Sequence, residues 1–224
     1  MSSDSLGRLV SIDHLPLEAR LHRAHRELMG TVATITVREV EADRAQVAIR
    51  TAFDRLHEID RRFSPYLEAS EISRIGRGEL TVPDAHPEVT TVLEACEALR
   101  VESGGRFSAW GFRADGRLDP SGYVKGWAIG EAIEILRDGG MSNVALGIGG
   151  DVAAYGGGAT GIGWSVGVVD PGVPTQMMAR VALRDAAIAT SGLAERPDHL
   201  RDPRRGTVVD SPWTSFTVVG PDIA

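Results

Sequence analysis

The sequence predicts an α+β fold in which mixed, largely antiparallel sheets are flanked by helices. Two observations lead to this class: strand-like segments lie toward both ends of the chain, and the main segments with helical periodicity lie between them. A regular strand–helix alternation, which would predict a parallel sheet, is not found. With 224 residues, of which 42% are hydrophobic, the chain is long enough to bury a sizeable core.

The N-terminal part predicts a tail, a strand and a long helix. Residues 1–20 show no clear pattern and are expected to be a tail, followed by a single domain over residues 21–224. Residues 29–37 alternate well enough to predict a strand. Residues 42–62 place apolar side chains on one helical face, which predicts an amphipathic helix packed against the core.

Two further helices are predicted before residue 105. Ser64-Pro65 breaks the long helix, and a polar loop leads to a short turn or helix that starts near Ser70. A helix from about Pro87 to Glu102 carries Cys96 on its apolar stripe. This single cysteine rules out an internal disulfide framework, and it is expected to be a buried structural thiol instead of a nucleophile.

The stretch from Asp119 to Asp151 predicts a helix and a buried strand. A turn over residues 119–122 leads into helical periodicity that stops at Gly139-Gly140, and an apolar run at residues 144–146 follows. Lys125 is expected in the first turn of the helix, where backbone N–H groups without intrahelical partners and the helix dipole favour phosphate.

The glycines after the predicted strand extend this possible phosphate site. Gly149-Gly150 lets a ligand approach the main chain closely, and Asp151 places a carboxylate beside it. A nucleotide-diphosphate site is one interpretation. The other is that the glycines only shape tight turns and that Lys125 is a solvated charge; these residues alone leave both open.

Better-known phosphate and nucleophile motifs do not fit. A dinucleotide fingerprint starting at Gly147 would need Gly or Ala where Val152 stands. A phosphate loop is excluded because its lysine must follow a glycine and precede a hydroxyl residue, whereas Lys125 lies between Val124 and Gly126. Serine-nucleophile hydrolysis is rejected because no triad order surrounds Ser191.

The last third predicts strands joined by glycine-rich turns. Glycines at 156–158, 161 and 163 indicate a hairpin connection. The segments with strand character are residues 164–169, 179–183, 186–189 and 213–219.

Composition excludes several classes of function. The net charge of −7 and the lack of a concentrated basic run argue against a nucleic-acid surface, with Arg201, Arg204 and Arg205 as a local exception. The N-terminus lacks the pattern of a secretory signal, and no segment reaches the roughly 18 apolar residues of a membrane span. A cytoplasmic protein is expected.

Six short motifs occur in a characteristic order along nearly the whole chain. They are Met29-Gly30-Thr31, Phe63-Ser64-Pro65-Tyr66 with Ser70-Glu71-Ile72-Ser73, Lys125-Gly126, Gly149-Gly150-Asp151, Thr190-Ser191-Gly192, and His199-x-x-Asp202-Pro203. Each is weak alone, but their order and spacing resemble the ApbE-type flavin transferases.

The resemblance implies an FAD:protein FMN transferase. Such an enzyme binds FAD and, with a divalent cation that is usually Mg²⁺, transfers FMN to a Ser or Thr hydroxyl of a target protein. The product carries the flavin through a phosphoester bond, and AMP is released. Two alternatives stay open: a non-catalytic FAD-binding protein of the same fold, and an FAD pyrophosphatase that gives FMN and AMP.

The resemblance also assigns residues to these roles. His199 matches the catalytic base, a role that suits an imidazole because its ordinary pKa lies near neutrality, and Lys125 matches the group that neutralises phosphate charge. The residues that it assigns to FAD binding are Met29, Gly30, Ser64, Tyr66, Ser70, Glu71, Lys125, Gly149, Gly150, Asp151, Thr190, Ser191 and Arg196.

Several positions depart from the family pattern. Ser108 stands where an Asp is common, and Gly130 stands where an acidic residue is expected, although Glu131 is adjacent. Gly147 replaces a customary Asn, and Arg205 replaces a Thr. These departures affect the expected activity more than the expected fold.

The resemblance places the metal partly on a main-chain oxygen near Gly122. The remaining ligands would come from an Ala-Asp-x-x-x-Thr motif that follows the strand matched by residues 215–224, and the given sequence stops before such a motif. With half the ligand set, the chain is expected to bind FAD but to transfer FMN slowly or not at all, unless Asp119, Asp151 or another carboxylate compensates.

Overall fold

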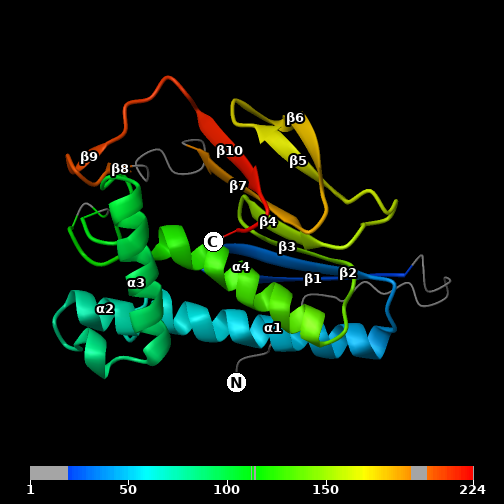
Figure 1. The fold of residues 1–224 in the computed structure, drawn as a ribbon, viewed down its shortest axis with the longest axis horizontal. Coiled ribbons are helices and arrows are strands. Elements are labelled where there is room, and N and C mark those ends of the chain that lie inside the picture. Colours follow the sequence, from blue (N-terminus) through cyan, green and yellow to red (C-terminus); the bar gives the residue numbers. More distant parts are fainter. Residues whose placement is uncertain (1–19, 112, 114, 193–200, 224) are drawn as a thin grey trace. The chain divides into compact units, whose positions relative to one another are not determined.

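The structure is a computed structural model that describes residues 20–111, 113, 115–192 and 201–223 (Figure 1). Its residues group into two compact units. Among the described residues, the first unit comprises 20–57, Trp127–Ser191 and Thr217–Ile223, and the second comprises those between Glu58 and Gly126 and between Gly192 and Phe216. The single domain over residues 21–224 therefore stays a prediction.

A six-stranded sheet of order β1-β2-β3-β4-β7-β10 organises the first unit (Figure 1). The pairs β1–β2, β2–β3, β3–β4 and β4–β7 are antiparallel, and the predicted α+β class is confirmed. The strands are β1 (Leu21–Leu28), β2 (Thr31–Arg38), β3 (Val144–Ile148), β4 (Asp151–Tyr155), β7 (Ala186–Gly192) and β10 (Ser215–Gly220).

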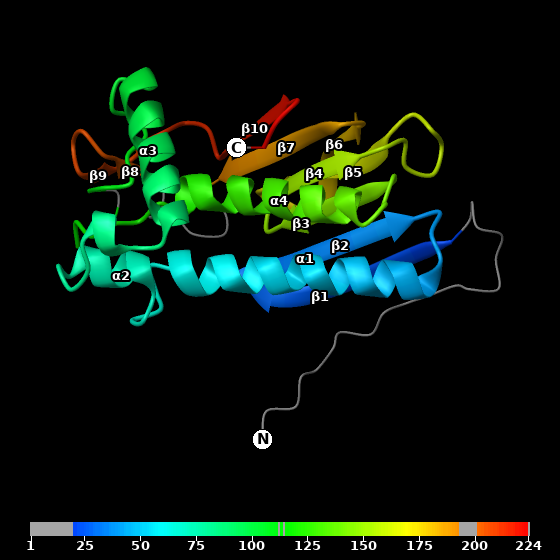
Figure 2. The same ribbon diagram turned by 60° about the horizontal axis from the view of Figure 1, so that its bottom comes forward.

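Helices cover one face of this sheet. Within the first unit, residues 42–57 of α1 (Ala42–Phe63) and residues 127–138 of α4 (Ser121–Asp138) run side by side (Figure 2). An ion pair between Arg55 and Glu131, with 2.8 Å between Nη2 and Oε2, joins the two helices. Alternate strand residues on this face, such as Ile35 and Leu146, are fully buried because side chains of one strand point to opposite faces in turn.

A hairpin covers part of the other face. It consists of β5 (Trp164–Asp170) and β6 (Val173–Leu183), which pair antiparallel. Leu183 at the end of β6 forms a buried cluster with Ala154 of β4 and Ile188 of β7. The residues that pack around this cluster are Ala145, Val152, Trp164, Val166, Val168, Val181 and Ala186.

The second unit is mainly helical. It contains α2 (Glu71–Gly76), the 3₁₀ helix η2 (Val82–Asp84), α3 (Pro87–Glu102), the first residues of α4, and the short strands β8 (Arg201–Asp202) and β9 (Thr207–Val208). Its buried apolar side chains include Phe63, Ile72, Ile75, Val89, Val92 and Cys96. None of the helices in the described ranges is long and apolar enough to cross a bilayer.

The helices α1 and α3 predicted from periodicity are confirmed, and the short turn or helix predicted near Ser70 is the helix α2. The structure corrects the start of α4. The Oδ1 atom of Asp119 accepts a hydrogen bond from the Ser121 amide at 3.0 Å, so the helix begins at Ser121 instead of after Gly122. Lys125 is therefore the fifth residue of the helix and lies in its second turn.

The strands show larger differences from the prediction. Strand β1 was not predicted, because two positions on its buried face hold His22 and Arg26 and break the hydrophobic alternation. Met29 and Gly30 form the turn between β1 and β2 and do not belong to a strand. Strand β6 begins at Val173, earlier than the predicted residue 179.

Candidate functional site

Two hairpin turns lie next to each other at one end of the six-stranded sheet. Met29 and Gly30 join β1 to β2, and both have positive φ, 53° and 68°. Gly149 and Gly150 join β3 to β4, and φ of Gly149 is 62°. Because β2 pairs with β3, the Gly149 amide donates to the Val32 carbonyl at 3.2 Å. The pairing brings together two turns that are remote in sequence.

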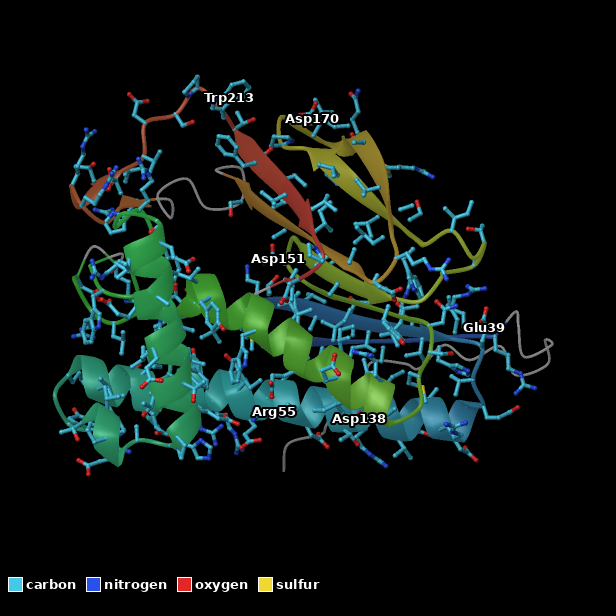
Figure 3. All side chains as sticks on the ribbon, viewed as in Figure 1. Glu39, Arg55, Asp138, Asp151, Asp170 and Trp213 are labelled. Atoms are coloured by element: carbon cyan, nitrogen blue, oxygen red, sulfur yellow. The ribbon has the colours of Figure 1, made fainter. Side chains whose placement is uncertain are left out.

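Asp151 and Thr190 extend this group within the first unit. Asp151, labelled in Figure 3, begins β4, and its Oδ1 accepts a hydrogen bond from the Thr190 amide at 3.2 Å. The Thr190 hydroxyl lies 3.0 Å from the hydroxyl of Thr217 on β10. Ser191 follows Thr190 in β7 and is exposed. Seven predicted site residues thus converge at one end of the sheet, namely Met29, Gly30, Gly149, Gly150, Asp151, Thr190 and Ser191.

The main chain of the β3–β4 turn is sterically open. Gly149 and Gly150 are exposed. A Cβ atom added at Gly150 would have as its nearest neighbours the carbonyl oxygen and Cβ of Thr190, at 3.5 and 3.7 Å, which are ordinary van der Waals distances. The geometry is compatible with the predicted approach of a ligand to this turn.

The predicted residues of the loop after α1 lie in the second unit, where Ser70 has a structural role. Ser70 is buried and caps α2: its Oγ accepts from the Ser73 amide at 3.0 Å and donates to the Ser64 carbonyl at 2.6 Å. A hydroxyl has one proton, and that of Ser70 is already donated. In this conformation the Ser70 hydroxyl can only accept a hydrogen bond from a ligand.

The carboxylate of Glu71 is held by protein groups on both oxygens. Its Oε2 accepts from the His86 amide at 2.6 Å, and its Oε1 lies 3.4 Å from Nε of Arg62. Arg62 also pairs with Glu58 and Glu88, at 2.9 and 2.6 Å. Sequence reasoning did not single out Arg62, because Glu71 and Glu88 become its neighbours only when α1, α2 and α3 pack together.

Tyr66 is the most solvent-accessible predicted residue of this loop, with 69% of its surface exposed. The guanidinium carbon of Arg113 lies 5.2 Å from the centroid of its ring, which is a cation–π distance. Arg113 also forms an ion pair with Asp115 at 3.1 Å. An exposed aromatic ring beside a cation is suited to stacking on a planar ligand.

The start of α4 offers fewer amides to phosphate than the sequence predicts. The Ser121 amide donates to Asp119, and the Tyr123 and Val124 amides both donate to the Pro120 carbonyl, at 2.9 and 3.0 Å. The buried carboxylate of Asp119 also places negative charge at this helix end. Binding of phosphate in this region would therefore depend on the side chain of Lys125.

Two departures from the family pattern have defined local partners. The hydroxyl of Ser108 donates to the Trp110 carbonyl at 2.7 Å and accepts from the Trp110 amide at 3.1 Å, which shapes a local turn. The carboxylate of Glu131 is paired with Arg55, whose guanidinium also lies 5.6 Å from the centroid of the Trp127 ring. Glu131 is thus engaged between the two helices, and whether it partly substitutes for the acidic residue missing at Gly130 stays a prediction.

The described residues contain no cluster of metal-binding side chains. Within residues 20–111, 113, 115–192 and 201–223, no group of three or more His, Cys, Asp or Glu side chains is placed to hold a metal ion. Gly122, the predicted metal residue, is the second residue of α4, and Asp119 uses Oδ1 to cap that helix. Two predicted site residues, Arg196 and His199, lie outside the described part of the chain.

Comparison with known proteins identifies the relatives of this chain. The model of the ApbE family matches residues 29–110 and 108–224. A curated FAD:protein FMN transferase from Vibrio cholerae is 25% identical to this chain, in an alignment that covers 85% of this chain and 74% of that protein.

Solved structures share the fold. The flavin transferase ApbE from Vibrio cholerae superposes with a TM-score of 0.76 and 19% identity, over 91% of this chain and 83% of that one. The apo form of the flavinyl transferase ApbE from Pseudomonas stutzeri gives a TM-score of 0.74 and 19% identity, over 91% and 80%. The ApbE protein from Thermotoga maritima gives a TM-score of 0.76 and 19% identity, over 91% and 82%. Since the family model matches almost the whole sequence, the chain belongs to the ApbE family.

Proposed function

We propose that this protein is an FAD:protein FMN transferase that binds FAD and transfers its FMN half to a Ser or Thr hydroxyl of an acceptor protein. The observation that carries the proposal is the convergence of the Met29-Gly30 turn, the Gly149-Gly150 turn, Asp151 and Thr190 at one end of the sheet. These residues come from three motifs that are remote in sequence. Family membership and the name of the curated relative support the same activity.

The transfer is a phosphoryl substitution. The acceptor hydroxyl oxygen attacks the phosphorus of the FMN half, a phosphoester bond forms, and the bond from this phosphorus to the bridging oxygen breaks so that AMP leaves. The hydroxyl proton goes to a general base, the role that we assign to His199. Lys125 is assigned to offset phosphate charge, and the exposed glycine turns let the ligand approach the main chain.

The residues that we assign to FAD binding lie in both units. In the first unit, Met29, Gly30, Gly149, Gly150, Asp151, Thr190 and Ser191 supply main-chain and hydroxyl contacts. In the second, Tyr66 supplies an exposed ring, while Ser64, Ser70 and Glu71 shape the loop that carries it. Arg196 is assigned to FAD binding from the resemblance alone. A dependence on Mg²⁺ remains a prediction from the resemblance.

An assay with FAD and a candidate acceptor domain tests the function. Purified protein is incubated with FAD and the acceptor, with and without Mg²⁺, and the products are separated by mass spectrometry. The acceptor is expected to gain the mass of FMN, and one AMP should appear for each modified acceptor. An acceptor with its target hydroxyl removed is the matched control and should stay unmodified.

The other outcomes separate the alternatives. FAD that is bound but never consumed would identify a non-catalytic flavin-binding protein. Free FMN and AMP without modified acceptor would identify a pyrophosphatase that uses water. Absence of FAD binding at micromolar concentrations would overturn the proposal as a whole.

A further inference from the structure

Two threonine hydroxyls meet beside the glycine turn, and only one of them belongs to a predicted site motif. Thr190 lies on β7 and Thr217 on β10, and their Oγ1 atoms are 3.0 Å apart. Both residues belong to the first unit. Thr217 lies in strand β10 and belongs to none of the six sequence motifs, so the sequence pattern does not distinguish it.

The main chain of Thr190 is already held in place. Its amide donates to Asp151 Oδ1 at 3.2 Å, and its carbonyl oxygen and Cβ are the atoms nearest to a Cβ built on Gly150. Its hydroxyl therefore lies at the edge of the open turn, and the remaining freedom is the direction in which that hydroxyl points its proton.

A hydroxyl pair leaves that direction undetermined in the absence of a ligand. Each hydroxyl has one proton and two lone pairs, so either threonine can donate to the other. If Thr217 donates, the proton of Thr190 is available to an acceptor oxygen of a ligand. Successive hydrogen bonds also polarise one another, which strengthens the outer bond.

We propose that Thr217 is a positioning residue, which donates to Thr190 so that Thr190 can donate its own proton to an oxygen of the bound flavin nucleotide. This inference rests on the proposed function. Thr217 itself does not touch the ligand, and its effect passes entirely through the Thr190 hydroxyl.

Substitution of Thr217 tests this role, with affinity for FAD measured by calorimetry. Thr217→Val keeps the branched shape that suits a strand and removes only the hydroxyl. The affinity for FAD should fall about threefold to tenfold, which corresponds to the net free energy of one hydrogen bond. Thr217→Ser keeps the hydroxyl and should bind FAD within about twofold of wild type. Thermal unfolding should show little change for either variant, because the residue is exposed.

A double-mutant cycle shows whether the effect passes through Thr190. In a Thr190→Val background, Thr217→Val should cause no further loss of affinity, because the hydroxyl that it positions is gone. An equal loss in both backgrounds would overturn the role and point to direct ligand contact by Thr217. Unchanged affinity of Thr217→Val, or failure of Thr217→Ser to retain affinity, would also overturn it. Wild-type protein that binds no FAD would instead contradict the proposed function, so the two failures are distinguishable.

Discussion

The two glycines of the β3–β4 turn face different backbone constraints. Gly149 has a φ of 62°, a backbone conformation that residues with a Cβ adopt at an energetic cost. The φ of Gly150 is not positive. This is the pattern of a type II′ hairpin turn, whose first central residue is usually glycine. The backbone conformation of the turn therefore favours glycine at position 149. At position 150 the fold does not require glycine, so a requirement for it would come from ligand binding.

Alanine substitutions should separate these two constraints. Gly149→Ala should lower the free energy of unfolding by about 1–2 kcal/mol because of its left-handed backbone. Gly150→Ala should change it by less than about 0.5 kcal/mol, because the added Cβ meets Thr190 only at ordinary distances. If a ligand approaches the main chain here, Gly150→Ala should nevertheless weaken FAD binding about tenfold or more, as measured by calorimetry. Unchanged affinity would place the ligand elsewhere.

Met29 is a bulky residue in a left-handed conformation. Both central residues of the β1–β2 turn have positive φ, as in a type I′ turn, for which Asn-Gly is the favoured pair. Met29→Asn should therefore raise the free energy of unfolding by about 0.5–1 kcal/mol in urea denaturation. Met29→Val, which puts a β-branched side chain at the same φ, is the matched control and should lower it. A less stable Asn variant would show that packing by the Met29 side chain outweighs the backbone strain.

At the scale of elements, one buried side chain fastens the glycine-rich connection between β4 and β5. Asn143 is 4% exposed, donates from Nδ2 to the Gly158 carbonyl and accepts at Oδ1 from the Gly158 amide, both at 2.9 Å. The connection itself contains several glycines and few side chains to pack. These two hydrogen bonds therefore substitute for the missing apolar contacts.

Removing this side chain should loosen the connection. Asn143→Ala leaves a buried amide and a buried carbonyl of Gly158 without a partner, so the free energy of unfolding should fall by about 2–4 kcal/mol. Ser142→Ala at the neighbouring exposed position is the matched control and should be neutral within about 0.5 kcal/mol. Chemical denaturation measures both variants. A neutral Asn143→Ala would mean that water replaces both hydrogen bonds.

At the scale of the whole molecule, the single cysteine can report on unfolding. Cys96 lies on α3 in the second unit, is 2% exposed, and burial raises the pKa of its thiol to about 12. The thiolate is the reactive form, so burial suppresses its reaction with thiol reagents through both access and ionisation. The predicted buried structural thiol is confirmed.

Alkylation should therefore be slow in the folded protein. At pH 8 iodoacetamide is expected to label Cys96 at least about 100-fold more slowly in the native protein than in urea, where the pKa of the thiol returns toward its ordinary value. Complete labelling of one thiol per chain in urea is the internal control, since the sequence has one cysteine. Rapid labelling without urea would show that the second unit opens readily under native conditions.

Local patterns in the sequence determined the three long helices and the presence of the glycine turns. Helical periodicity and capping signals act within a few turns, so the apolar stripe of α1 and the Ser70 cap of α2 could be read without knowledge of distant residues. The order of the short motifs was also sufficient to predict the ApbE family, which the comparisons confirm.

Only the tertiary structure decided which of these segments meet. Asp151 and Thr190 are 39 residues apart, and Thr190 and Thr217 are 27 apart, so their hydrogen bonds depend on the strand order β4-β7-β10, which no local pattern encodes. The same holds for β1, whose buried His22 is satisfied by the carbonyl of Val40 at 2.9 Å. Propensity and periodicity act between near neighbours, whereas strand pairing joins remote residues whose polar side chains become acceptable inside the fold only once their partners are in place.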